Sequence, residues 1–228
     1  PNGTIEHIHI DRTTPEHAIK SLYLDQPRHL IYMGTHQGGL VTMDTRTKQI
    51  RRFTAEQGFL PDNRVRQLVA YGDTLFFSTE RGIGLLNRAT GQFQTLDSLP
   101  VSGELSHLYL HGSTLWFARQ HTTYAYHITN HLLTTYPIPR PVHVFSSDLD
   151  GNLIAGTIDG ILSFDTQSDT WMPHQQLNTC LDSHSVIDIL TTPQHYIIAT
   201  SMGLTLISPD GKTVQHLNAK TGFPLEIL

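Results

Sequence analysis

The chain has 228 residues, 38% of them hydrophobic, which is enough for a substantial core and excludes a disordered chain. Its formal net charge of -5, with both signs mixed along the sequence, predicts no nucleic-acid binding and no direct membrane contact. The single cysteine, Cys180, excludes an internal disulfide and any site built from several cysteines.

Short apolar runs recur along the chain at a nearly fixed interval. Each repeat opens with one run and then has a turn and a second run, which ends in a small residue and a polar or charged one. These pairs are Gly34-Thr35, Ser78-Thr79, Ala118-Arg119, Gly156-Thr157 and Ala199-Thr200. They are 44, 40, 38 and 43 residues apart, and two further runs complete each repeat. Four short strands in about 40 to 45 residues are typical of a propeller blade.

We therefore predict an all-β chain, a β-propeller of about five four-stranded antiparallel blades. The predicted blades span residues 18–58, 59–99, 100–140, 141–181 and 182–218. Residues 1–12 are similar to the end of the last repeat, so we expect the closing strand of a preceding blade there; 219–228 resemble the start of a following one. This pattern favours an arc of a larger propeller, and a closed five-bladed ring with two tails is the alternative.

Motifs of known catalytic or cofactor chemistry are absent from their required contexts, so we predict no cofactor and no metal. The DLDGN segment at 148–152 is interpreted as a hairpin turn, because the residues after it do not continue a calcium loop. His7 and His9 share one face of a predicted strand but have no third ligand nearby. Four turn residues are expected to be solvent-exposed and to form local hydrogen bonds: Asp25, His29, Asp148 and Asp150.

The loops between second and third strands, together with the linkers between blades, meet at one end of a propeller and are where we look for a ligand site. Their polar side chains could bind sugar hydroxyls or a carboxylate. The candidates are His36, Gln37, Asn63, Arg64, Glu80, Arg81, Arg119, Gln120, His121 and Asp159. The alternative is that these side chains are only solvated and that Asp62 and Asn63 cap a turn. Four aromatic residues are instead expected in the core between blades: Trp116, Tyr124, Tyr126 and Trp171.

Three classes of function remain open on the residues alone. The first is a sensor that binds an oligosaccharide or another small molecule without catalysis. The second is a metal-assisted lyase, because His36, Glu80 and His121 fall in corresponding loops. The third is a scaffold that contacts other blades or domains of its own protein, or forms a homodimer through an unpaired edge.

The second repeat carries a family resemblance. GFLPDNRVRQL at 58–68 and LFFSTERGIGLLNRATGQF at 75–93 resemble the two-component regulator propeller repeat, and the segments 33–53 and 147–166 match it more loosely. The third repeat departs most, since RQHTTYAYHI replaces its glycine-containing turn.

The resemblance covers about residues 18–217 and implies the periplasmic sensor region of a hybrid two-component system histidine kinase, in which carbohydrate sensing is common. It implies a non-enzymatic segment, with the kinase and the membrane segment outside these residues.

Overall fold

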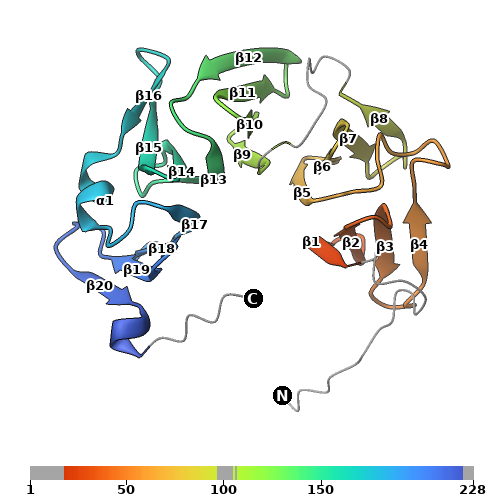
Figure 1. Cartoon of the computed structure of the whole chain (residues 1–228). Helices are drawn as coiled ribbons and strands as arrows, with labels where there is room; N and C mark the ends of the chain where they lie inside the picture. The colour runs from red at the N-terminus through yellow and green to blue at the C-terminus, as the bar shows by residue number, and fades with distance from the viewer. Residues whose placement is uncertain (1–17, 97–104, 106, 223–228) are drawn as a thin grey trace. The chain divides into compact units, whose positions relative to one another are not determined.

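The computed structural model describes residues 18–96, 105 and 107–222, and it confirms the all-β class. The chain divides into two compact units, Pro1–Glu104 and Leu105–Leu228. The first unit holds two four-stranded antiparallel sheets and the second holds three (Figure 1). In every sheet the strands pair in chain order, which is the topology of a propeller blade, so the predicted fold class is confirmed.

The first unit contains two blades. Their strands are β1 (Ile19–Asp25), β2 (Leu30–Thr35), β3 (Leu40–Asp44) and β4 (Ile50–Phe53), followed by β5 (Gln67–Tyr71), β6 (Thr74–Thr79), β7 (Gly82–Asn87) and β8 (Phe93–Thr95). Tyr32 and Leu40 of the first sheet pack with Leu75, Phe77 and Leu86 of the second in one buried cluster. The two sheets of this unit are therefore joined face to face by apolar side chains.

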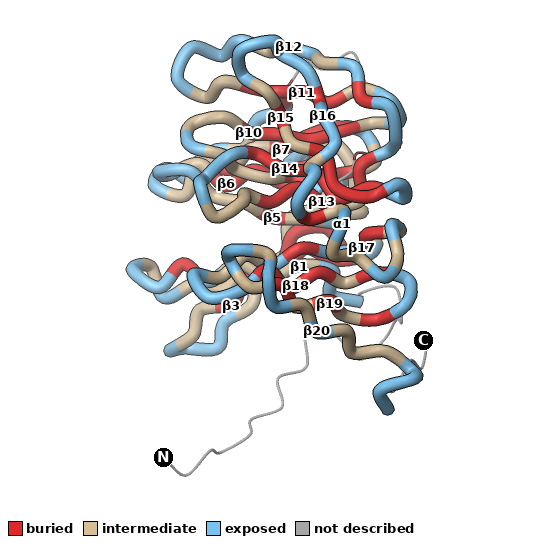
Figure 2. The backbone as a smooth tube through the Cα atoms, turned by 90° about the vertical axis from the view of Figure 1, so that its left-hand side faces the viewer, coloured by how far each residue is buried: buried red, intermediate tan, exposed pale blue. Residues whose placement is uncertain are grey.

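The second unit contains three blades. Their strands are β9 (Tyr109–His111), β10 (Thr114–Arg119), β11 (Thr122–His127) and β12 (Leu132–Pro137); β13 (Val142–Ser147), β14 (Leu153–Thr157), β15 (Gly160–Asp165) and β16 (Thr170–Pro173); and β17 (Val186–Thr191), β18 (Tyr196–Thr200), β19 (Gly203–Ile207) and β20 (Val214–Leu217). Figure 2 shows buried stretches along second strands such as β6 and β14, whose residues are almost all buried.

The predicted closing strand at 1–12 lies outside the described residues, as do residues 223–228. Of the segment predicted to open a following blade, the described part forms the short 3-10 turn η2 (Ala219–Thr221). The side chain of Asn218 caps this turn by accepting a hydrogen bond from the Lys220 N–H at 3.0 Å.

In the first and fourth repeats the glycine that marks the repeat lies where the next blade approaches. A Cβ atom on Gly156 would be 2.6 Å from Cγ1 of Val186, which begins β17 of the following blade. A Cβ atom on Gly34 would be 2.8 Å from the carbonyl oxygen of Val65, in the segment that leads to β5. Both distances are shorter than van der Waals contact, so close packing between blades explains this part of the motif.

The threonine that follows the small residue closes the turn between second and third strands. In four blades its hydroxyl donates to a backbone carbonyl three or four residues further on. The pairs are Thr35 to Gly39 at 2.8 Å, Thr79 to Gly82 at 2.9 Å, Thr157 to Gly160 at 2.9 Å and Thr200 to Gly203 at 3.3 Å. Because these threonines are buried, each hydroxyl pairs with a backbone carbonyl away from the surface, as buried polar groups require.

Replacing Thr157 with valine should lower the free energy of unfolding by about 1–3 kcal/mol. Valine keeps the shape but cannot donate to the Gly160 carbonyl, nor accept from the Asp159 N–H as Thr157 Oγ1 does at 3.1 Å. Urea unfolding measures the difference. The matched control is Thr166→Val in the exposed turn before β16, where a change within about 0.5 kcal/mol is expected. Equal effects at both positions would contradict this structural role.

A short helix, α1 (Gln175–Cys180), lies between β16 and β17 and was not predicted from the sequence. The side chain of Asn178 in this helix forms two hydrogen bonds with the backbone of Ile161. It accepts one from the Ile161 N–H at 2.8 Å and donates one to the Ile161 carbonyl at 2.9 Å. Leu177 is fully buried in the core between the last two blades. A six-residue helix is too short to form alone, so these tertiary contacts stabilise it.

His174 caps the start of α1 and gives a pH-dependent prediction. Its Nδ1 accepts a hydrogen bond from the Leu177 N–H at 3.4 Å, which only the neutral ring can do. Burial lowers the pKa of His174 in the folded chain, outweighing the opposing effect of Asp148. The stability that the neutral ring contributes is therefore complete above the unfolded pKa of about 6.5 and is lost as the pH falls through the lower folded pKa.

The variant His174→Asn should be less sensitive to acid than the natural chain. Asparagine is a good helix cap and does not titrate. Chemical unfolding at about pH 7.5 and pH 5.5 gives the stability that each protein loses between these pH values. The difference between the two losses reports on His174, because the other histidines contribute equally to both proteins. If both chains lose the same stability between these pH values, the prediction is wrong.

Candidate functional site

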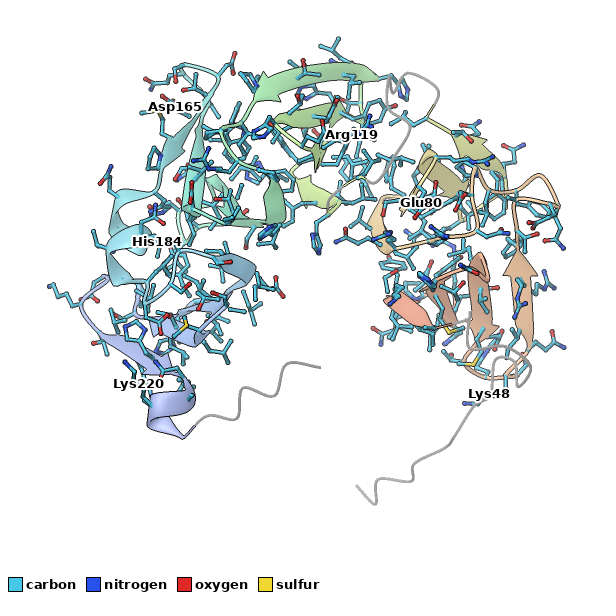
Figure 3. All side chains as sticks on the ribbon, in the orientation of Figure 1. Lys48, Glu80, Arg119, Asp165, His184 and Lys220 are labelled. Atoms are coloured by element: carbon cyan, nitrogen blue, oxygen red, sulfur yellow. The ribbon has the colours of Figure 1, made fainter. Side chains whose placement is uncertain are left out.

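The predicted ligand residues are divided between the two units. His36, Gln37, Asn63, Arg64, Glu80 and Arg81 belong to the first, whereas Arg119, Gln120, His121 and Asp159 belong to the second. Figure 3 labels one from each, Glu80 and Arg119. Each set is therefore described within its own unit.

Glu80 lies in the turn between β6 and β7 and is bound by two arginines. Its Oε1 accepts a hydrogen bond from Arg64 Nη1 at 2.5 Å and lies 3.5 Å from Arg66 Nη2. The hydrogen bond from Arg64 lowers the pKa of the Glu80 carboxyl, so the group is charged near neutral pH. The structure thus brings Arg64 and Glu80 together in a half-buried pair near the surface, whose energy is small.

The linker residues Asp62 and Asn63 order the backbone between the first two blades. Asn63 Oδ1 accepts from the Ala55 N–H at 2.8 Å, and its amide nitrogen donates to Glu56 at 2.8 Å. Asp62 Oδ1 accepts from the Arg64 N–H at 2.8 Å. These contacts support the turn-capping alternative for both residues.

His36, Gln37 and Arg81 are on the turns after β2 and β6. The backbone N–H of His36 donates to the carbonyl of Ala18 at 2.9 Å, while its side chain is exposed. Gln37 is half-buried. The Arg81 side chain is 77% exposed, and its Nε lies 3.8 Å from Asp62 Oδ2. Arg81 and His36 are the candidates in this unit that solvent reaches most easily.

In the second unit the turn between β10 and β11 carries Arg119, Gln120 and His121. Gln120 has a left-handed backbone with φ of 52°, as the tight turn requires. His121 is exposed, and its carbonyl accepts from the Ile138 N–H at 3.0 Å. Asp159, on the turn between β14 and β15, forms an exposed ion pair with Arg140. Arg119 is half-buried at the end of β10.

The residues proposed for metal binding are divided between the two units. His36 and Glu80 belong to one unit and His121 to the other. Within the described ranges no group of three His, Cys, Asp or Glu side chains is placed to hold a metal ion. His7 and His9 lie outside those ranges.

Of the four turn residues that were expected to be exposed, Asp148 forms the predicted hairpin turn, whereas Asp25 is buried. Asp148 Oδ1 accepts from the N–H groups of Asp150 and Asn152 at 2.9 and 2.8 Å, and its Oδ2 accepts from the Asn152 amide. Asp150 and His29 are exposed. The predicted exposure of Asp25 is wrong, because its side chain is only 2% exposed, although its Oδ1 accepts the predicted local hydrogen bond from the Arg28 N–H at 3.3 Å. Its position at the end of β1 is covered by the neighbouring blade.

Asp25 belongs to a buried ion-pair network that sequence reasoning missed. It accepts hydrogen bonds from Arg88 Nη1 at 2.5 Å and Arg28 Nη1 at 3.2 Å. Arg88, 6% exposed, also donates to the Tyr23 hydroxyl at 2.9 Å and lies 5.1 Å over the ring centroid. Arg28 continues the network to Asp73 on the turn between β5 and β6. The network therefore ties the two blades of the first unit together.

A signal for Arg88 was present in the repeat alignment. It follows the third strand at the position where the first and fourth repeats have Thr45 and Thr166. A charged residue in place of a repeated threonine indicates a contact specific to one blade. Its partner could not be named, because Asp25 is 63 residues away in the chain.

The predicted burial of the aromatic residues is confirmed, and the predicted position between blades is confirmed for Trp116 and Trp171. Trp116, Tyr124, Tyr126 and Trp171 are all at least nine-tenths buried. They are core residues and are not available to stack on a sugar.

Comparison with known proteins gives the fold. No family model and no curated protein matches the chain. Solved structures do match: two extracellular domains from B. thetaiotaomicron, both assigned to hybrid two-component systems, have TM-scores of 0.72 and 0.70 and identities of 19% and 18%. The alignments cover 88% and 91% of this chain. The chain has the β-propeller fold of these extracellular domains.

The chain spans 28% of the length of each of these two structures. PorZ, a bacterial surface component of the type-IX secretion system of Porphyromonas gingivalis, is similar with a TM-score of 0.68 and 14% sequence identity. The alignment covers 88% of this chain and 28% of the PorZ chain. In the described part of the chain no helix has the length and apolarity needed to cross a bilayer. The structural neighbours thus include the class of protein that the repeat resembles.

Proposed function

We propose that this chain is part of the periplasmic sensor region of a hybrid two-component signalling protein, and that it responds to a glycan-derived ligand without catalysing a reaction. Close packing between blades and turn hydrogen bonds that recur in four of the blades stabilise the fold. The observation that carries the proposal is the fold shared with extracellular domains of two-component systems.

The turns between second and third strands support ligand binding at that end of each blade. Arg81 and His121 are exposed there, and neither belongs to a buried network. Guanidinium and imidazole groups can donate hydrogen bonds to the hydroxyls of a sugar. In contrast, Asn63 is engaged by its own linker, and Glu80 and Asp159 are held in ion pairs.

Thermal unfolding of the full chain with a panel of oligosaccharides tests the proposal. A ligand that binds only the folded state at about 100 times its dissociation constant adds about 2.7 kcal/mol of stability. Arg81→Ala and His121→Ala sample the relevant turn in each unit. We expect at least one of them to weaken binding about tenfold or more.

Lys212→Ala is the matched control, because Lys212 is 83% exposed on the turn between β19 and β20, at the other end of its blade. It should leave binding unchanged. If no oligosaccharide raises the melting temperature, the glycan ligand is rejected and a scaffold is favoured. If the intact protein turns over a glycan, and removal of bound metal stops the turnover, the lyase alternative replaces the sensor.

A further inference from the structure

A pocket of about 450 Å³ opens between the two sheets of the first unit. β2, β3 and β4 form one wall, and the end of β7, the following turn and β8 form the other. Its volume is in the range of small-molecule sites. The turns that carry Arg28 and Gly91 border it, so it lies at the opposite end of these sheets from Arg81 and is separate from the proposed sensor site.

Strand register places polar side chains in a row on one wall. Tyr32 is paired with Thr42, and Thr42 with Arg51, so the three lie side by side on the same face. Arg51 is exposed, and its side chain forms no ion pair or hydrogen bond with any residue that the structure describes. Its whole guanidinium is therefore available to a ligand.

The rest of the pocket supplies apolar contact. The rings of Phe53 and Phe93, from opposite walls, have centroids 4.9 Å apart and are tilted by 42°. Leu86 is buried behind them. A flat or ring-shaped ligand could cover these side chains on one side while its polar groups face the other wall.

Hydrogen-bond donors outnumber acceptors among the lining side chains. Arg88 lines the pocket, and its buried Nε has no hydrogen-bond partner among the described residues. Asp44 is the carboxylate of the lining, and its Oδ1 already accepts from the N–H groups of Arg46 and Thr47, both at 2.8 Å. Those bonds lower the pKa of Asp44, so it remains an anion.

The charges alone do not select a ligand. Arg28 and Arg88 are paired with Asp25 and Asp73, and the lining also holds Asp44 and Arg51, so the positive and negative charges in and around the pocket are equal in number. The unused donors are the distinguishing feature, because a buried N–H without a partner is costly and gains most from a strong acceptor.

We propose that this pocket binds a small ring compound that bears a carboxylate, with the carboxylate on Arg51 and toward the Arg88 Nε, and the ring against Phe53 and Phe93. Arginine binds carboxylates with two parallel hydrogen bonds, which a neutral hydroxyl cannot match. The ring could come from a sugar acid or from an aromatic acid, since both present the same chemistry.

Isothermal titration of the full chain with D-glucuronate, benzoate and D-glucose tests the proposal. We expect saturable binding of at least one carboxylate with a dissociation constant of about 1 mM or tighter, and binding of glucose at least about tenfold weaker. Which acid binds better distinguishes the two sources. Arg51→Ala should weaken carboxylate binding at least about tenfold. Arg51 is exposed, so this variant is expected to fold.

Arg46→Ala is the control, since Arg46 is an exposed arginine on the same hairpin that does not line the pocket. It should bind like the natural chain. The proposal is overturned if neither carboxylate binds, if glucose binds equally well, or if Arg51→Ala binds as tightly as Arg46→Ala. None of these results bears on the oligosaccharide test, which uses other variants at the other end of the sheets.

Discussion

Replacing Asp25 with alanine should lower the free energy of unfolding of the first unit by about 3–5 kcal/mol. Asp25 is 2% exposed and accepts from Arg88, which is 6% exposed. Without the carboxylate, the Arg88 guanidinium stays between the two sheets, and the Tyr23 hydroxyl and the Gly72 carbonyl are its remaining hydrogen-bond acceptors among the residues that the structure describes. A buried charge that loses its counter-ion is among the costliest single changes in a protein.

Far-UV circular dichroism during urea unfolding measures this loss, since both tryptophans are in the second unit and their fluorescence would not report on the first. The control is Asp73→Ala. This change removes an ion pair with Arg28, but the Asp73 side chain is 57% exposed. Its cost should stay below about 1 kcal/mol. A loss for Asp25→Ala no larger than for the control would show that the network contributes little.

Replacing Trp171 with alanine should destabilise the second unit by about 3–5 kcal/mol. The indole lies with its centroid 6.0 Å from Trp116 and 5.2 Å from Phe164, in the cluster that joins the third and fourth blades. Its Nε1 donates to Thr123 Oγ1 at 2.9 Å, a buried bond between side chains 48 residues apart. Alanine leaves a cavity in both blades and removes that donor.

Trp171→Phe separates the two contributions, because phenylalanine fills most of the volume but cannot donate to Thr123. It should cost less than alanine, about 1–3 kcal/mol. Fluorescence of the remaining Trp116 follows unfolding. The control is Met172→Ala on the same strand, 54% exposed, with an expected change within about 0.5 kcal/mol. Equal losses at positions 171 and 172 would contradict an inter-blade role for the indole.

Several parts of the candidate site could be predicted because they depend on nearby residues. The turn at Asp148 is formed by hydrogen bonds within four residues, and the capping by Asn63 reaches only eight. The burial of Trp116 and Trp171 followed from their place in apolar strands. The ligand role of the exposed Arg81 and His121 stays a prediction.

Other parts could not be predicted, because they join segments that are distant in the chain. Asp25 looked like a solvent-exposed turn residue, since its sequence neighbours are Gln26 and Pro27 and its counter-ion is 63 residues away. The helix α1 has no sequence pattern that predicts it, and it depends on the hydrogen bond that Asn178 accepts from Ile161 in β15. The alignment of Tyr32, Thr42 and Arg51 on neighbouring strands could not be predicted, because it depends on the register of three strands and periodicity alone does not set that register.

By itself the sequence determined the all-β class, the four strands of each repeat and the turns between them, because strand alternation and turn chemistry act over a few residues. It also placed a small residue at the same point of each repeat, but the contact of Gly34 and Gly156 with the next blade came from the structure. Only the tertiary structure decided which charged groups are buried together and where a pocket opens between sheets. Those features arise from pairs of side chains that meet only after the blades pack, and their chemistry differs from one blade to the next.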